Sequence, residues 1–359
     1  MTSITLPLNP KSNKKTTRNS SVEFFRCLMM LFVVIDHCNG HGIFGYEKMD
    51  FHGIWHSPFA LLSVHVGGFV AISGWYGIVF SWKKVLSLYG MIVFYSVLGC
   101  IAWNVYETSS FSFKGINISG GWFGSNYLVL LFLTPFLNNC INCFNEKAKL
   151  LKAWGLLAFV CFLAWLPLGA VIGIAPLGVD EFSLFFMVFI YITARIAHNV
   201  FSNPIPLSKL IAAGLISLFI ALIFLIIKRV FPVMGSIDMQ FTRSRMAPYY
   251  YCLSIILLMF FIWHIRLPKW LGHICLFISP SLFPVYLIHD TTRIGHSLYL
   301  IPQKWLWENT TLHPFFIVLA TSISTFCICL LIDMIRRYFL FVGNHLVTTT
   351  LRCQKFINR

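Results

Sequence analysis

Residues 21–42, SVEFFRCLMMLFVVIDHCNGHG, form an apolar run with Glu23 and Arg26 near one end and Asp36 and His37 near the other. The run has about the 20 residues that an α-helix needs to cross a bilayer. A cleavable signal sequence would not begin with an acid and a base, and no small-residue cleavage site follows this run. We therefore predict that residues 21–42 hold the first transmembrane helix of the mature protein.

The polar residues of this run are predicted to share one side of the helix. At about 100° per residue, Arg26 and His37 return to within roughly 20° of one another, about 16 Å apart along the axis. Glu23 lies one turn before Arg26, and Asp36 lies about 80° away, beside His37. Such a stripe must face protein or a water-filled cavity, because a charge in hydrocarbon is costly. For a single helix, an interfacial Glu–Arg pair and a headgroup-level histidine explain the pattern equally well.

The composition excludes a soluble globular protein. Of the 359 residues, 58% are hydrophobic and only 11% are charged, whereas soluble domains have about 25% charged residues. The formal net charge is +15, and the basic residues are scattered between apolar runs. Basic residues in this pattern set membrane orientation and contact anionic lipid. We therefore expect membrane lipid as a partner and exclude nucleic acid.

The sequence predicts an all-α, polytopic transmembrane helical bundle of about ten spans. Residues 1–20 are polar and basic, so we expect a disordered cytoplasmic tail there. Residues 21–340 are the expected transmembrane domain, and residues 341–359 are a second basic cytoplasmic tail. The predicted spans lie at 21–39, 57–80, 85–104, 122–143, 151–172, 181–198, 208–227, 247–265, 270–289 and 313–335.

The distribution of Lys and Arg predicts that both termini are cytoplasmic. With that orientation most basic residues fall in cytoplasmic segments, as the positive-inside rule requires. Lys83 and Lys84 then lie on the cytoplasmic side. Segment 228–245 is an exception, because it concentrates basic residues on the side of the membrane opposite the cytoplasm. We expect it either to contact an anionic ligand or glycan or to be a snorkelling cluster at a helix end.

The ninth run ends PVYLIHD, with His289 and Asp290 as its last residues. The first and ninth runs both lead outward in this topology, so this pair shares a membrane face with Asp36 and His37. Histidine is suited to proton transfer near neutral pH, and an adjacent carboxylate orients it. We therefore predict a basic cytoplasmic mouth and a histidine-bearing outer chamber.

Other notable residues have structural explanations. Ser73 and Gly74 permit close approach of helices, and Trp122 and Tyr127 fit the aromatic belt at the outer interface. Cys140 and Cys143 form a CxxC, but no second pair or histidine follows at zinc spacing. We therefore expect no metal.

Four segments resemble motifs of the acyltransferase-3 membrane proteins and occur in that family's order. The first is NSSVEFFRCLMMLFVVIDHC, which resembles the signature of the family's first helix. It is followed by GGFVAISGWYGIVFSWKKVLSLY, GGWFGSNYLVLLFLTPFLN and FPVYLIHD. Together the four segments and the chain between them cover most of residues 20–290.

The resemblance implies an integral O-acyltransferase of the bacterial inner membrane. Members of the family take an acyl group, usually acetyl from cytoplasmic acetyl-CoA, and place it on hydroxyls of surface carbohydrates. By position, His37 is then the catalytic histidine, Arg26 supports it, and Lys83 and Lys84 handle the acyl-CoA. The chain departs from the family where it has Lys-Lys instead of an Arg-rich pair and an acid, Asp36, instead of an apolar residue.

The expected chemistry is removal of a proton from a sugar hydroxyl by His37, with Asp36 or Glu23 tuning the imidazole. An acyl-histidine intermediate is the variant. We expect His289 to assist or to bind the acceptor. Substrate contacts are expected from four residues of the matching motifs: Ser73, Trp75, Trp122 and Tyr127.

The main alternative is a membrane transporter that exports a glycan or a lipid-linked intermediate. Transporters often have internal repeats and paired broken helices, and the two halves of this sequence have no clear repeat. A membrane sensor or scaffold would leave the stripe of Arg26 and His37 unexplained. A soluble nucleotide enzyme is excluded, because the sequence has no P-loop and no glycine-rich turn after a strand.

Overall fold

The structure is a computed structural model of the chain and describes residues 18–43, 64–107, 113, 116–144, 146–165, 183–230 and 252–357. Within these ranges the regular structure is entirely helical. The helices are α1 (Ser20–Gly40), α4 (His65–Tyr76), α5 (Trp82–Glu107), α6 (Gly121–Asn142), α7 (Lys147–Trp165), α9 (Leu184–Val200), α10 (Leu207–Val230), a helix at Cys252–Trp263, α13 (Lys269–Ile278), η2 (Ser279–Ser281), α14 (Leu282–Thr291), α15 (Arg293–Asn309) and α16 (Pro314–Ile357).

Each of the ten predicted apolar runs contains one of these helices. Among the described residues, three segments are long and apolar enough to cross a membrane, namely Trp82–Glu107, Lys269–Thr291 and Pro314–Gly343. The prediction of an all-helical membrane protein is therefore confirmed, while ten spans and cytoplasmic termini stay predictions. Residues 1–17 of the expected tail, residues 57–63 of the second run and residues 231–245 of the basic segment lie outside the described residues.

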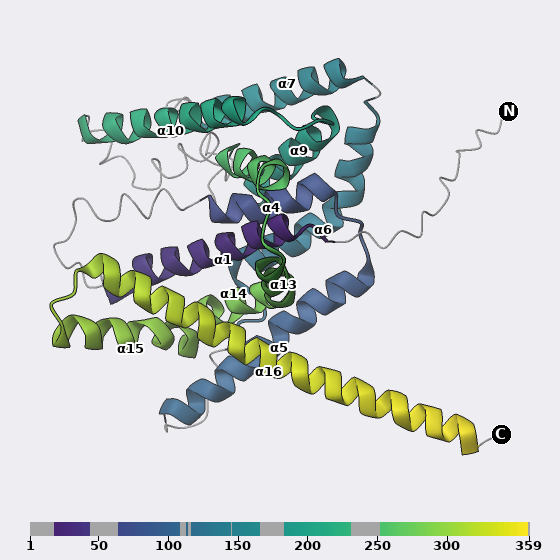
Figure 1. Ribbon diagram of the computed structural model, residues 1–359, viewed down its shortest axis with the longest axis vertical. Coiled ribbons are helices and arrows are strands. Elements are labelled where there is room, and N and C mark those ends of the chain that lie inside the picture. Colours follow the sequence, from purple (N-terminus) through teal and green to yellow (C-terminus); the bar gives the residue numbers. More distant parts are fainter. Residues whose placement is uncertain are drawn as a thin grey trace.

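Helix α1 lies in the middle of the bundle, with α7 and α10 along one edge and α15 and α16 along the other (Figure 1). It begins where the predicted run begins, because Asn19 caps it and accepts a hydrogen bond from the backbone N–H of Ser21 at 3.0 Å. It contacts α4, α13, α14 and α16. The amino end of α1 and the carboxyl end of α16 point to the same side of the molecule.

The ninth predicted span is not one straight helix. It divides into α13 and α14 at the short 3-10 turn η2, which contains Pro280. Proline lacks the N–H of a helical hydrogen bond and its ring clashes with the preceding turn, so the α-helix is interrupted there. After the break, α14 packs against α1, α5, α15 and α16, and it carries His289 into the bundle.

Helix α15 was not predicted, and α16 is longer than predicted. The sequence of α15 has too many polar residues to register as an apolar run, but its buried residues Gly295, Tyr299 and Gln303 recur every four residues on one face. That face packs against α5, α14 and α16. Helix α16 continues to Ile357, so residues 341–357, expected as a tail, are helical.

The small residues of α4 allow close helix packing, as predicted. The described part of the second run contains the 12-residue α4, which ends at Tyr76 because Gly77 has a φ of +68°. Helix α4 packs along α9. A Cβ atom on Gly74 would lie only 2.3 Å from the backbone oxygen of Tyr191 on α9.

We predict that Gly74→Ala destabilises the protein by about 1–3 kcal/mol, because the added methyl group forces α4 and α9 apart. The measurement is the apparent melting temperature of the purified protein in detergent. Gly90→Ala in α5 is the matched control, since a Cβ there would meet nothing within 4 Å. Equal melting temperatures for the two variants would contradict the prediction.

Candidate active site

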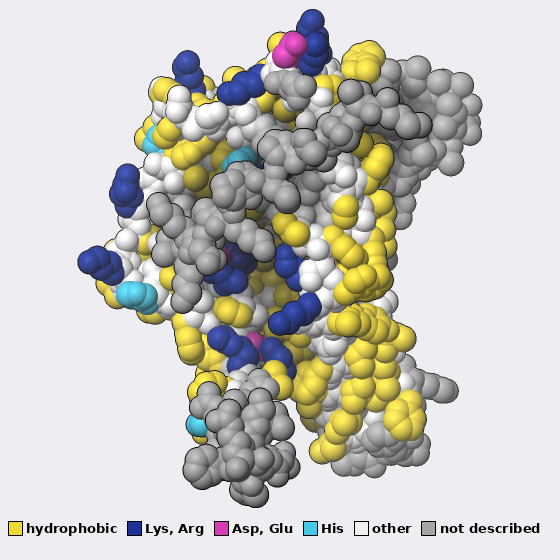
Figure 2. Space-filling view, turned by 90° about the vertical axis from the view of Figure 1, so that its right-hand side faces the viewer, with side chains coloured by type: hydrophobic (Ala, Val, Ile, Leu, Met, Phe, Trp, Pro, Cys, Tyr) yellow, Lys and Arg dark blue, Asp and Glu magenta, His cyan; other side chains and the backbone are white. Residues whose placement is uncertain are grey.

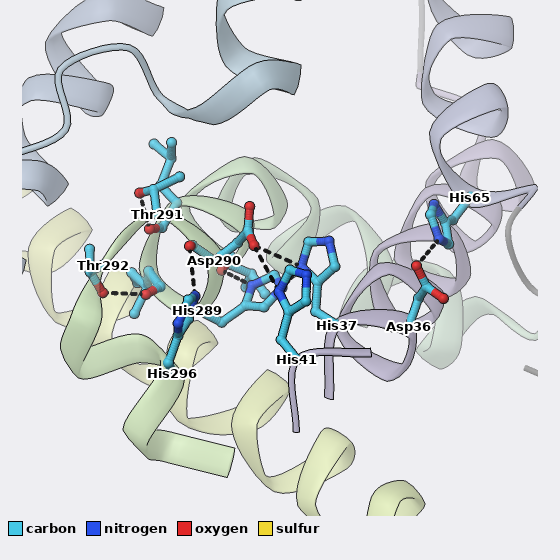
Figure 3. Close-up of polar contacts among 12 residues, drawn as sticks. Asp36, His37, His41, His65, His289, Asp290, Thr291, Thr292 and His296 are labelled. Atoms are coloured by element: carbon cyan, nitrogen blue, oxygen red, sulfur yellow. Dashed lines mark hydrogen bonds and ion pairs between the residues drawn. The ribbon is translucent and has the colours of Figure 1, made fainter. Parts of the chain in front are cut away.

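Two histidines from opposite ends of the sequence meet at the ends of α1 and α14. The Nδ1 atom of His37 lies 3.0 Å from the Nε2 atom of His289. The same Nδ1 atom lies 3.3 Å from Oδ1 of Asp290. The side chain of His289 is fully buried, whereas those of His37 and Asp290 are 14% and 13% exposed. The structure therefore brings together the two His/Asp segments that the topology placed on one membrane face (Figure 3).

Two further histidines surround Asp290. The Nδ1 atom of His41 lies 4.0 Å from Oδ1 of Asp290, and its ring stacks on the ring of His37 at 5.3 Å. On the other side, Nε2 of His296 lies 3.0 Å from the backbone oxygen of Asp290 and donates its proton to it, since a carbonyl only accepts. Asp290 is thus the centre of a polar cluster to which α1, α14 and α15 all contribute (Figure 3).

This cluster is also the place where a cation would fit. Ligand atoms of His41, Asp290 and His296 lie within 4.8 Å of one another. Two imidazoles and a carboxylate are a donor set that zinc accepts. His296 is held by the backbone oxygen of Asp290, and His41 lies at ion-pair distance from the Asp290 carboxylate, so the geometry does not require an ion, and we assign none.

Asp36 faces a different neighbour from His37. Its Oδ2 atom lies 3.5 Å from Nε2 of His65, a buried side chain on α4. Successive residues of a helix point in directions about 100° apart, so Asp36 turns toward α4 while His37 turns toward α14. We expected Asp36 or Glu23 to tune His37. The carboxylate within ion-pair distance of His37 is Asp290 of α14. Asp36 lies within electrostatic range of His37 as well, so its tuning role stays a prediction.

Between these two pairs is a cavity whose empty space, together with the solvent-open part at its mouth, is about 530 Å³. It lies between α1, α4, α6 and α14, and His37 and Asp36 form part of its wall with His65. Its other lining residues are largely apolar or aromatic: Met30, Val33, Val66, Phe69, Trp122, Phe123 and Tyr286. Small-molecule sites have this character, a mostly apolar cleft with a few polar groups that converge on it.

The charged pair of α1 lies further toward its amino end. Arg26 forms an ion pair of 2.6 Å with Glu23, whose side chain is 6% exposed. Eleven residues of helix separate Arg26 from His37, about 16 Å along the axis. Arg26 is within electrostatic range of Tyr76 and Tyr127. The predicted stripe therefore has two separate polar centres, one at Arg26 and one at His37.

The residues expected to contact substrate do not all lie at the cavity beside His37. Trp122 lines the cavity beside His37. Ser73 and Tyr127 are hydrogen-bonded to each other at 3.0 Å, and the ring of Tyr127 stacks on Phe123 of the cavity wall. Trp75 is not part of the cavity wall, because its ring packs against His198 and Trp263.

Lys83 and Lys84 are exposed in the first turn of α5. Lys84 donates a hydrogen bond of 2.9 Å to the backbone oxygen of Val79, in the segment that joins α4 to α5. They are not among the residues that line the cavity. The start of α5, which carries them, lies on the side of the molecule to which the amino end of α1 points. Figure 2 shows Lys and Arg side chains gathered near the middle of that face.

Five residues near His37 were not predicted as site residues: His41, His65, Tyr286, Asp290 and His296. The sequence shows His289 and Asp290 as neighbours, but it does not show that both would contact the same nitrogen of His37. His296 belongs to α15, which was not predicted. For His65 and His41, no sequence pattern indicates a partner.

A buried glutamine holds the end of α1 in place beside this site. Gln303 of α15 is fully buried and donates hydrogen bonds to the backbone oxygen of Cys38 at 2.9 Å and to Thr321 of α16 at 3.2 Å. Its side-chain oxygen accepts a hydrogen bond from the backbone N–H of Ile43 at 3.1 Å. The backbone on both sides of His41 is therefore tied to α15.

Comparison with known proteins gives one match. A family model described as an acyltransferase domain matches residues 19–334, which include every residue of the site described above. The comparison with curated proteins found no match, and the comparison with solved structures found none either.

We predict that Gln303→Leu lowers the free energy of unfolding by about 1–3 kcal/mol, because it leaves buried backbone groups near Cys38 and Ile43 without partners. The apparent melting temperature in detergent measures this effect. Lys304→Ala on the exposed face of α15 is the control, because its 4.0 Å pair with Glu308 is a surface ion pair of little energetic value. A Gln303→Leu variant as stable as the control would show that the tie is not needed.

Proposed function

The chain belongs to the acyltransferase-3 family, as its four motifs predicted, and on that premise we propose that it transfers an acetyl group from cytoplasmic acetyl-CoA to a hydroxyl of a cell-surface carbohydrate. His37 acts as the general base, and the enzyme works in the bacterial inner membrane. The observation that carries the proposal is the position of His37, which lies in the wall of the cavity and is paired with both His289 and Asp290. The family match favours this activity over the transporter alternative.

The proposed reaction is a direct transfer. His37 takes the proton of the acceptor hydroxyl as the hydroxyl oxygen bonds to the carbonyl carbon of the thioester. The carbon–sulfur bond then breaks, and the CoA thiolate leaves and recovers the proton from the imidazolium of His37. Asp290, 3.3 Å from Nδ1, stabilises the positive charge that His37 carries between these two steps. A placed general base of this kind contributes roughly 10²–10⁴-fold to the rate.

The two polar centres of α1 suit the two ends of the donor. The roughly 16 Å between Arg26 and His37 means that Arg26 does not reach a carbonyl group that is reacting at His37. We therefore assign Arg26 to the path of the donor and not to the developing oxyanion. The phosphates of CoA call for Lys and Arg at the entrance, and the basic face in Figure 2 supplies such residues.

The cavity wall suits a carbohydrate acceptor and a short acyl group. Trp122, Phe123 and Tyr286 offer aromatic surfaces next to His37. Val33 and Met30, one and two turns before His37 on α1, line the same cavity with apolar groups. Acetyl transfer through an acyl-histidine intermediate is the variant. It predicts labelled protein after incubation with labelled acetyl-CoA and no acceptor, whereas direct transfer predicts none.

We predict that His37→Ala lowers the turnover of acetyl transfer by roughly 10²–10⁴-fold, because the hydroxyl loses its base. The assay is transfer of labelled acetyl from acetyl-CoA to surface carbohydrate in isolated membranes. His273→Ala is the control, since His273 is exposed on α13 and outside the cavity wall. Near-normal turnover by a correctly inserted His37→Ala variant would reject the assignment.

The Lys83→Ala/Lys84→Ala double variant should raise KM for acetyl-CoA more than it lowers turnover at saturation, because these charges bind the donor and do not take part in the chemistry. Initial rates over a range of acetyl-CoA concentrations measure both quantities. Lys152→Ala, another exposed lysine, on α7, is the control. An unchanged KM in the double variant would remove both lysines from the donor site.

A further inference from the structure

The ring of His289 connects His37 to the helix backbone. Its Nδ1 atom lies 2.6 Å from the backbone oxygen of Val285, one turn earlier in α14. Its Nε2 atom lies 3.0 Å from Nδ1 of His37. The side chain of His289 is fully buried. A chain of hydrogen bonds therefore runs from a carbonyl group of α14 through one imidazole to the next.

The direction of these hydrogen bonds follows from the groups that make them. A carbonyl oxygen can only accept, so Nδ1 of His289 carries a proton. A neutral imidazole has one donor and one acceptor, which makes Nε2 of His289 an acceptor. The hydrogen in the 3.0 Å contact therefore comes from Nδ1 of His37. The other nitrogen of a neutral His37, Nε2, keeps its lone pair.

Asp290 acts on His37 in the same direction. Its Oδ1 atom lies 3.3 Å from the same Nδ1 atom. A carboxylate is also only an acceptor, so it favours a proton at that position. Two acceptors, one neutral and one charged, thus face Nδ1 of His37, and neither of them is paired with Nε2.

We propose that His289 is a positioning residue that holds His37 in the tautomer with its proton on Nδ1, so that Nε2 is the atom that accepts a proton from the acceptor hydroxyl. The inference rests on the proposed role of His37 as the general base and adds the atom through which it acts. In this role His289 need not touch either substrate. A histidine that only fills space in the core would leave both tautomers of His37 accessible.

The first test reads the tautomer without an activity assay. The purified full-length protein in detergent is treated with bromoacetate, which alkylates the imidazole nitrogen that has a free lone pair. The Nε2 and Nδ1 products at residue 37 are then separated after proteolysis. We expect the Nε2 product almost alone in the wild type and a mixture of both products in His289→Leu. The exposed His273 is the reference in the same sample and should give the same product ratio in both proteins.

The second test uses two substitutions at His289. His289→Leu removes one of the two acceptors that face Nδ1 of His37, and we expect kcat to fall by about tenfold, less than the roughly 10²–10⁴-fold expected when the base itself is lost, with KM for acetyl-CoA nearly unchanged. His289→Gln retains an amide oxygen that can accept from Nδ1 of His37, and we expect it to recover most of the lost kcat. A purely structural role predicts no such recovery. The melting temperatures of both variants establish that they fold.

The outcomes separate this inference from the proposed function. If His37→Ala is inactive but the wild type gives both alkylation products, or the products do not change in His289→Leu, His37 is the base and the inference about His289 is wrong. If His37→Ala is active, the proposed function is wrong whatever the alkylation shows. If bromoacetate does not reach His37, equal kcat values for the Leu and Gln variants overturn the inference.

Discussion

The contact between His37 and His289 is the interaction on which the arrangement of the site depends. The two residues are 252 positions apart in the sequence, yet their ring nitrogens lie 3.0 Å apart. In a bundle that sits in lipid, a buried polar ring has to find its partner within the protein, because no water is available to supply one. The ends of α1 and α14 must therefore meet at this point, and the rest of the bundle has to allow it.

Several features of the fold make this meeting possible. The 3-10 turn at Pro280 separates α13 from α14, and both helices pack against α1, with His289 on α14. The unpredicted helix α15 then follows directly after α14 and contributes both His296 and the buried Gln303. Gln303 fixes the backbone at Cys38 and Ile43, on either side of His41. Residues outside α1 thus determine where α1 ends beside His37.

The sequence predicted the helices far better than it predicted the partners of the site residues. A long apolar run is a strong signal because lipid requires it, so every expected run contains a helix. The geometry of a single helix also placed Glu23 correctly beside Arg26, a contact within one turn. In contrast, the partner of His37 could not be read from α1 alone. Asp36 is its neighbour in sequence, but adjacent helix residues face different helices, and each pairs with a residue from another part of the chain.

The same limit applies to α15. Its buried residues recur every four positions, but the residues between them are largely polar, so the segment does not form an apolar run. Lys83 and Lys84 illustrate the opposite case. The distribution of Lys and Arg along the sequence predicts that these two lysines share a face with other basic residues. The structure, however, does not place them among the residues that line the cavity. Charge patterns therefore indicate a face, whereas tertiary contacts determine a site.

The cost of burying charge explains why a second histidine, and not a carboxylate alone, lies deepest at this site. An ionised group within the bundle is costly unless it is paired and hydrogen-bonded. A neutral imidazole, bonded to the carbonyl of Val285, can orient His37 without introducing a charge. Asp290, which is partly exposed and has histidines around it, is better placed to remain ionised. In the proposed mechanism the fully buried position thus serves orientation, and the partly exposed one serves the charge that His37 gains when it takes a proton.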